Sequence, residues 1–88
     1  MIAIDKKQLR ADAHTLKPVV MIGQAGLTPA VLAEIEIALD AHELIKIKIR
    51  AERDDRKEIA AAICVGTNAD LIQSIGQIAV VYRKNPKK

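Results

Sequence analysis

The spacing of apolar residues predicts a helix at the start of the chain. Leu9, Ala13 and Leu16 recur at helical intervals and would form its buried stripe over about residues 5–15. Pro18 would end this helix, because proline cannot continue the backbone hydrogen-bond ladder.

Two further helices carry their own start and stop signals. Thr28 is suited to an N-cap, and Pro29 suits the first helical position, where no N–H is needed. Apolar positions then continue at three-to-four spacing to about residue 41. The stretch from Asp55 to Glu58 has the spacing of a capping box and would open a third helix, which Gly66 would stop.

The remaining apolar segments predict strands. Residues 19–22 are continuously apolar, which is typical of a strand buried on both faces. Residues 44–50 alternate strictly between isoleucine or leucine and basic residues, which predicts a half-buried strand. Residues 72–75 and 78–82 flank Gly76-Gln77, and this arrangement fits a hairpin with a two-residue type II′ turn.

The element order is therefore α-β-α-β-α-β-β. A β-α-β connection favours parallel neighbours with a right-handed crossover, whereas the terminal hairpin adds an antiparallel pair. We expect the 88 residues to form one compact α/β domain, a four-stranded mixed sheet carrying three helices. Residues 84–88 would be a frayed basic tail.

The composition excludes several classes of protein. With no Trp, no Phe and one Tyr, the chain cannot supply the exposed rings on which RRM and OB domains stack bases. A single cysteine excludes an internal disulfide and a Cys-based zinc site, and it suits a reducing compartment. No secretory signal or membrane-spanning run is present in the sequence, so we expect a cytoplasmic protein without a membrane partner.

The charge is unevenly distributed along the chain. Residues 27–43 contain four carboxylates and no Lys or Arg, which gives them a charge of −4. Since the net charge is +3, the other residues together carry +7. Segregated positive charge is what a protein needs to bind nucleic acid.

The loop Gly23-Gln24-Ala25-Gly26 is the first candidate site. It joins a predicted strand directly to a capped helix, so its N–H groups and the positive end of the helix dipole can converge on an anion. KH domains clamp RNA backbone with such a GxxG loop. A tight turn without a ligand is the alternative, and the loop by itself does not exclude it.

Two sets of basic residues could extend such a site. The first set shares one face of the first predicted helix, where the alternative is a merely solvated face: Lys7, Arg10, His14 and Lys17. The second set lies on one face of the alternating strand: Lys46, Lys48 and Arg50. These three could contact phosphates or protect an exposed sheet face or edge from aggregation, and we favour protection slightly. The tail cations could add non-specific phosphate affinity: Arg83, Lys84, Lys87 and Lys88.

Catalytic and metal sites are not indicated. Cys64 lies in a small apolar segment typical of a core, and His42 near a helix end complements the helix dipole. No nucleophile–base pair or clustered metal ligands can be assembled, and the loop lacks the Lys-Ser/Thr ending of a P-loop. We therefore expect a protein that is not an enzyme and needs no cofactor or metal.

Several stretches together resemble the YhbY family, bacterial proteins that consist of a stand-alone CRM domain. The resemblance covers about residues 9–83 and is carried by "LKPVVMIGQAGLTPAVLAEIEIALDAHELIKIKI", "DRKEIA" and "QSIGQIAVVYR". It implies a KH-like fold and an RNA-binding protein of ribosome biogenesis that associates with precursors of the large (50S) subunit.

The resemblance also implies a site. The family's RNA-binding loop falls on Gly23, Gln24, Ala25 and Gly26, with nearby basic residues, here Lys7, Arg10 and Lys17, extending the surface. Many relatives place a basic residue where this chain has Gln24, so backbone amides and neighbouring cations would hold the phosphates.

The expected partners are therefore large-subunit precursor rRNA and the pre-ribosomal particle, bound by a monomer. The alternative is an adaptor that docks on a ribosomal or assembly protein through the acidic second helix, by Glu34, Glu36 and Asp40.

Overall fold

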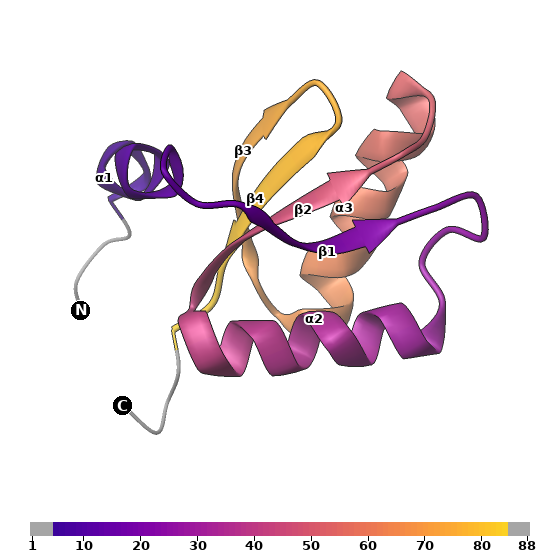
Figure 1. The fold of residues 1–88 in the computed structure, drawn as a ribbon, viewed down its shortest axis with the longest axis horizontal. Coiled ribbons are helices and arrows are strands. Elements are labelled where there is room, and N and C mark those ends of the chain that lie inside the picture. The colour runs from indigo at the N-terminus through magenta and orange to yellow at the C-terminus, as the bar shows by residue number, and fades with distance from the viewer. Residues whose placement is uncertain (1–4, 85–88) are drawn as a thin grey trace.

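The computed structural model describes residues 5–84 and has the element order that the sequence predicts (Figure 1). The three helices and four strands are α1 (Lys6–Ala13), β1 (Pro18–Ile22), α2 (Pro29–His42), β2 (Leu44–Ile49), α3 (Arg53–Thr67), β3 (Asp70–Ile75) and β4 (Ile78–Tyr82). The four strands form one mixed sheet, as expected. Of the predicted tail, residues 85–88 lie outside the described part of the chain.

The strand order in the sheet is β1-β2-β4-β3. β1 and β2 are parallel neighbours joined through α2, as predicted. The second β-α-β connection does not make neighbours, because β4 lies between β2 and β3 and pairs antiparallel with both. The hairpin turn itself is as predicted: Gly76 has a φ of +54° and the flanking Ile75 and Ile78 pair.

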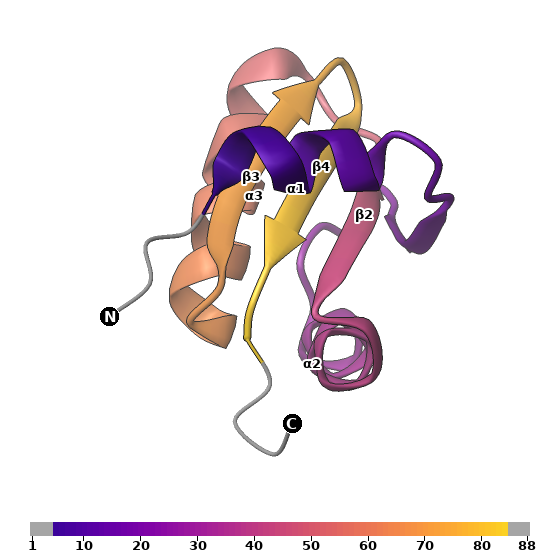
Figure 2. The ribbon, with the colours of Figure 1, turned by 90° about the vertical axis from the view of Figure 1, so that its left-hand side faces the viewer.

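The helices cover the sheet unequally (Figure 2). α2 and α3 lie on one face, where the main core contains Ile35 and Leu39 of α2, Ile63 of α3 and the three isoleucines of β2. α1 lies alone on the other face, with Ala13 and Leu9 against Ile72 and Val80. We call this second face the open face, because one eight-residue helix is its only helical cover among the described residues.

β1 is an edge strand, and the prediction that both of its faces are buried is wrong. Val20 and Ile22 point into the main core, whereas Val19 and Met21 are 51% and 54% exposed. The continuous apolar run hides this alternation, since α1 packs against β2 and β3 and leaves the open-face side chains of β1 uncovered.

The first helix is shorter than predicted. Asp5 is its N-cap, and its carboxylate accepts a hydrogen bond from the Gln8 N–H. The helix ends at Ala13, so Leu16 lies beyond it and is exposed instead of completing the buried stripe.

The other two helices differ in how well their ends were predicted. Thr28 caps α2 as expected, with its hydroxyl accepting a hydrogen bond from the Val31 N–H at 3.2 Å. α3 begins two residues before the predicted capping box, so Asp55 lies in its first turn, where a carboxylate favours the helix dipole. Gly66 is helical, and Asn68 ends the helix in the left-handed conformation.

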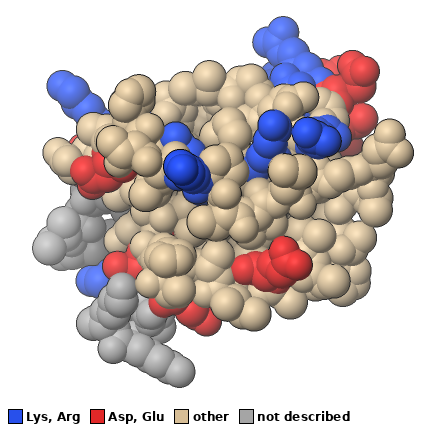
Figure 3. Space-filling view, in the orientation of Figure 1, with Lys and Arg blue, Asp and Glu red and all other residues tan. Residues whose placement is uncertain are grey.

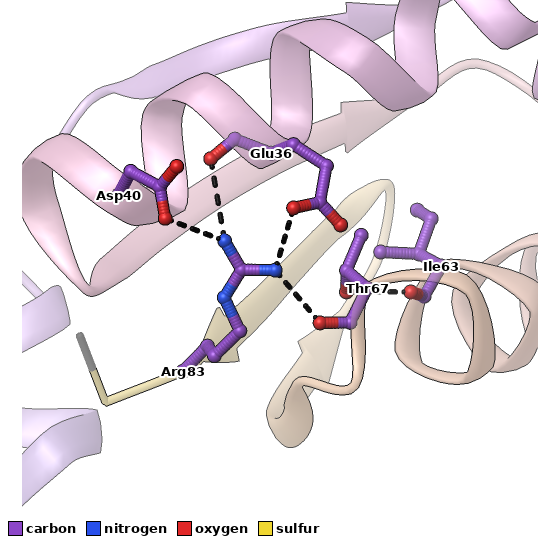
Figure 4. A network of polar contacts seen from close by, with 5 residues as sticks. All are labelled: Glu36, Asp40, Ile63, Thr67 and Arg83. Carbon is purple, nitrogen blue, oxygen red and sulfur yellow. Dashed lines mark hydrogen bonds and ion pairs between the residues drawn. The ribbon is translucent and has the colours of Figure 1, made fainter. Parts of the chain in front are cut away.

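Arg83 joins the end of β4 to both helices of the main core (Figure 4). Its Nη1 donates to Glu36 Oε2 and to the Thr67 carbonyl, each at 2.8 Å, and its Nη2 donates to Asp40 Oδ1 at 2.9 Å. The hydrogen bond and charge of Glu36, followed by those of Asp40, raise the pKa of the guanidinium. Arg83 is therefore a structural residue, and its grouping with the tail cations was wrong.

Candidate nucleic-acid interface

The GxxG loop is an exposed turn at the end of β1 (Figure 1). The Gly26 N–H donates to the Gly23 carbonyl at 3.0 Å, and Gly26 has a φ of +75°, a conformation that favours glycine. Gly23 does not have a positive φ, and a Cβ built on it meets nothing within 4 Å. The turn thus favours glycine at position 26, whereas the space around Gly23 is open.

The N-terminus of α2 offers fewer donors than an uncapped helix. The Val31 N–H is already bound by the Thr28 hydroxyl, and Pro29 has no N–H. The amides of Gln24 and Ala25 make no hydrogen bond within residues 5–84 and lie in exposed positions. The free donors of this site therefore belong mainly to the turn itself.

A shallow hollow of about 650 Å³ lies beside the loop. Gly23, Gln24 and Gly26 form one part of its lining, and Arg50 is its only cation. Three carboxylates from the start of α3 also line it: Glu52, Asp55 and Glu58. The electrostatics therefore favour an anion on the Arg50 side of the loop and oppose one on the α3 side.

The basic side chains of β2 lie on the open face of the sheet. β2 has a strand partner on both sides, so the interpretation that they protect a sheet edge is wrong. Lys46 is in register with Pro18, and Lys48 with Met21. Lys46 and Lys48 are half-buried, so their stems also cover apolar sheet surface, whereas protection of the open face from aggregation stays a prediction.

The α1 cations do not flank the GxxG loop. α1 and the loop lie at opposite ends of β1 (Figure 1), which rises roughly 16 Å over its five residues. Lys7 and Arg10 lie on the helix, His14 is its C-cap and Lys17 follows it, all exposed. The helical stripe predicted for these four residues therefore ends at His14, and Lys17 is not part of it.

β2 runs between these two places and connects them. Six cations lie on α1, just after α1, on β2 and just after β2, and we call them the basic track: Lys7, Arg10, Lys17, Lys46, Lys48 and Arg50. None of them forms an ion pair with a carboxylate of residues 5–84. In Figure 3, several Lys and Arg side chains lie across the upper half of the face shown, and Asp and Glu side chains lie at the upper right and left of this face as well as lower down.

The residues considered for catalysis do not come together. Cys64 is half-buried on α3, and burial, followed by the charge of Asp70, raises the pKa of its thiol. A raised pKa lowers the thiolate fraction at neutral pH, which is the reverse of nucleophile activation. Within residues 5–84 no group of three His, Cys, Asp or Glu could hold a metal ion. No described helix is long and apolar enough to span a bilayer.

The fold and this surface define a small α/β domain with a glycine turn and a set of cations that have no carboxylate partner among residues 5–84. The family model of the CRS1 / YhbY (CRM) domain matches residues 3–83. The chain belongs to this family, as the sequence resemblance indicated.

Its relatives agree with this assignment. It is 54% identical over 83 residues to a Pseudomonas aeruginosa protein named as a probable RNA-binding protein, covering 93% of this chain and 80% of the relative. It is 52% identical over 79 residues to an RNA-binding protein of Haemophilus influenzae, covering 89% and 80% respectively. A solution structure from Staphylococcus aureus, 35% identical, superposes with a TM-score of 0.81 over 90% of this chain and 83% of that one.

Proposed function

We propose that this chain binds RNA and assists assembly of the large ribosomal subunit by associating with its precursor. The observation that carries the proposal is the basic track, six cations without carboxylate partners among residues 5–84. The chain's membership of the CRM family and its relatives that are named for RNA binding also support RNA binding. The resemblance to YhbY proteins supplies the ribosomal precursor as the target.

The basic track and the loop would have different tasks. Lys46, Lys48 and Arg50 neutralise phosphates along β2, which releases counterions and provides most of the affinity. The Gln24 and Ala25 amides then donate to a phosphate that lies on the Arg50 side of the turn. The carboxylates at the start of α3 repel phosphate from the other side, and so fix where the backbone can leave the loop.

The protein would act by holding an RNA conformation as a monomer, without covalent chemistry. A chain with one Tyr, no Phe and no Trp has little means of stacking bases, so the contacts are mainly with RNA backbone. Such binding depends strongly on salt and weakly on sequence.

The first experiment measures RNA affinity against salt for a variant with Lys46, Lys48 and Arg50 changed to Ala. Each lost phosphate contact should reduce the slope of log K against log salt by about 0.7 for single-stranded RNA. Arg53→Ala with Lys57→Ala is the matched control, because both cations are exposed on α3 and lie outside the track. An unchanged slope in the triple variant would place the phosphate contacts elsewhere.

The second experiment tests the ribosomal target. A tagged wild-type chain should co-sediment with precursors of the large subunit, and the triple variant should not. The adaptor alternative predicts that the complex survives nuclease treatment. The structure makes that alternative less attractive, because Glu36 and Asp40 are already paired with Arg83.

A further inference from the structure

A second hollow lies on the open face of the sheet, between α1 and the strands. Its volume is about 400 Å³, within the range of sites that bind small molecules. Arg10 and His14 of α1 form one wall, and Lys46 of β2 lies at its side. Gln73, Ile75 and Ile78 of the β3–β4 hairpin complete it. We call this hollow the α1 groove.

The wall of the α1 groove beside the helix is positively charged. Arg10 forms no ion pair within residues 5–84, and no Asp or Glu lines the groove. Lys46 Nζ lies 3.4 Å from the His14 carbonyl oxygen, so its ammonium is held at the C-terminal end of α1. The positive charge of this wall therefore comes from Arg10 and Lys46, and the ammonium of Lys46 also offsets the negative end of the α1 dipole.

The opposite part of the groove is apolar with one amide. Ile75 is 62% exposed, and the partly buried Ile78 lies beside it in register. The Gln73 side chain, in register with Val80, makes no hydrogen bond within residues 5–84. A primary amide offers both a donor and an acceptor, which is what the edge of a nucleobase requires.

We propose that the α1 groove holds one unpaired nucleotide of the bound RNA. The base lies against Ile75 and Ile78 with its edge on the Gln73 amide, and its phosphate lies between Arg10 and Lys46. The proposal rests on RNA binding by the basic track, to which Arg10 and Lys46 also belong. It adds a limited base preference to a surface that otherwise contacts phosphates. An acidic peptide would satisfy the cations but would leave the apolar floor and the amide without a matching group.

The test compares the affinities of RNA decamers of uridine, cytidine and adenosine. The wild type should distinguish the best from the worst decamer by roughly tenfold, the effect of one well-made base contact. Gln73→Leu keeps the size of the side chain and should bring the three affinities to within about twofold of one another. Ser74→Ala is the control, because the exposed Ser74 lies in the same hairpin but outside both the α1 groove and the hollow beside the GxxG loop, and it should keep the wild-type preference.

The outcomes separate this proposal from the proposed function. If the wild type binds all three decamers equally, or if Gln73→Leu keeps the preference, the groove is not a base site although RNA binding stands. If no decamer binds, the proposed function and the groove proposal both fail. A glutamate-rich decapeptide that binds more tightly than every RNA decamer would make the groove a protein site and overturn the proposal. Unchanged melting temperatures of both variants exclude unfolding as the cause.

Discussion

The Arg50 N–H donates a hydrogen bond of 2.9 Å to the Ile22 carbonyl oxygen. This bond joins Ile22, the last residue of β1, to Arg50, the residue that follows β2. The GxxG loop begins at the position directly after Ile22. The Arg50 side chain and the turn therefore line the same hollow although they are 24 or more positions apart in sequence. The bond is a backbone contact, so it persists in side-chain variants of Arg50, which can be used to test charge alone.

The two loop glycines should respond differently to substitution. Gly23→Asp should leave the melting temperature nearly unchanged, since a Cβ there meets nothing, and should weaken RNA binding by placing a carboxylate at the phosphate contact. Gly26→Ala should lower the free energy of unfolding by about 1 kcal/mol because of its positive φ.

Gly23→Ala is the control for the Asp variant, because it adds a Cβ without a charge. Thermal unfolding and an RNA titration measure both effects. Full affinity in Gly23→Asp would remove the loop from the mechanism.

The cations around α1 should contribute affinity that depends on salt. Replacing Lys7, Arg10 and Lys17 with Ala should reduce the magnitude of the slope of log K against log salt by up to about 2. This value assumes that each cation contacts one single-strand phosphate and contributes roughly 0.7 to the slope. The expected loss is largest at low salt and small at high salt. A slope equal to that of the wild type would show that RNA does not reach this end of the track.

Arg83→Met should destabilise the fold. The substitution leaves the Thr67 carbonyl and Glu36 without their donor, and we expect a loss of about 2 kcal/mol in the free energy of unfolding. Asp40→Asn should cost well under about 1 kcal/mol, because the Asp40 side chain is 66% exposed. Urea unfolding measures both, and similar losses in the two variants would contradict the central place given to the Thr67 and Glu36 contacts.

Cys64 should react slowly with thiol reagents. At pH 8 the folded chain holds less thiolate than the unfolded chain, because burial and Asp70 raise the pKa of the thiol. The fold thus favours the protonated thiol, and this preference contributes to the free energy of unfolding. The contribution is complete below pH about 9 and is lost as the pH rises through the raised pKa of the thiol. Ellman's reagent measures the rate in native buffer and in urea, and Asp70→Asn should speed the native reaction. Equal native and unfolded rates would be inconsistent with a shielded thiol.

The sequence predicted elements better than surfaces. The capped start of α2 and the alternation of β2 could be read from single residues, because Thr28 and the isoleucines act through local geometry. The place of β4 between β2 and β3 depends on long-range pairing, for which no local signal exists. The exposure of Met21 was hidden for the same reason, since it depends on how far α1 covers the open face.

The candidate site also combines a part with a local sequence signal and a part that depends on long-range contacts. Four adjacent residues are enough to predict the GxxG turn, whereas the place of Lys46, Lys48 and Arg50 between the turn and α1 depends on the pairing of β2 with β1, which is a long-range contact. Gln73 and Ile75 carry no sequence signal for a site, because only α1 above them turns their surface into a groove.

The β2 part and the α1 part of the basic track differ in how firmly the fold holds them. Lys46 and Lys48 project from a strand paired on both sides, so their attachment points stay about 6.8 Å apart, a fixed repeat. Lys7 and Arg10 belong to a helix held by a small cluster around Ala13, separate from the main core. If the proposed function holds, a bound RNA strand must match the fixed spacing along β2, and we expect α1, which is packed by the smaller cluster, to be the part that adjusts to the strand.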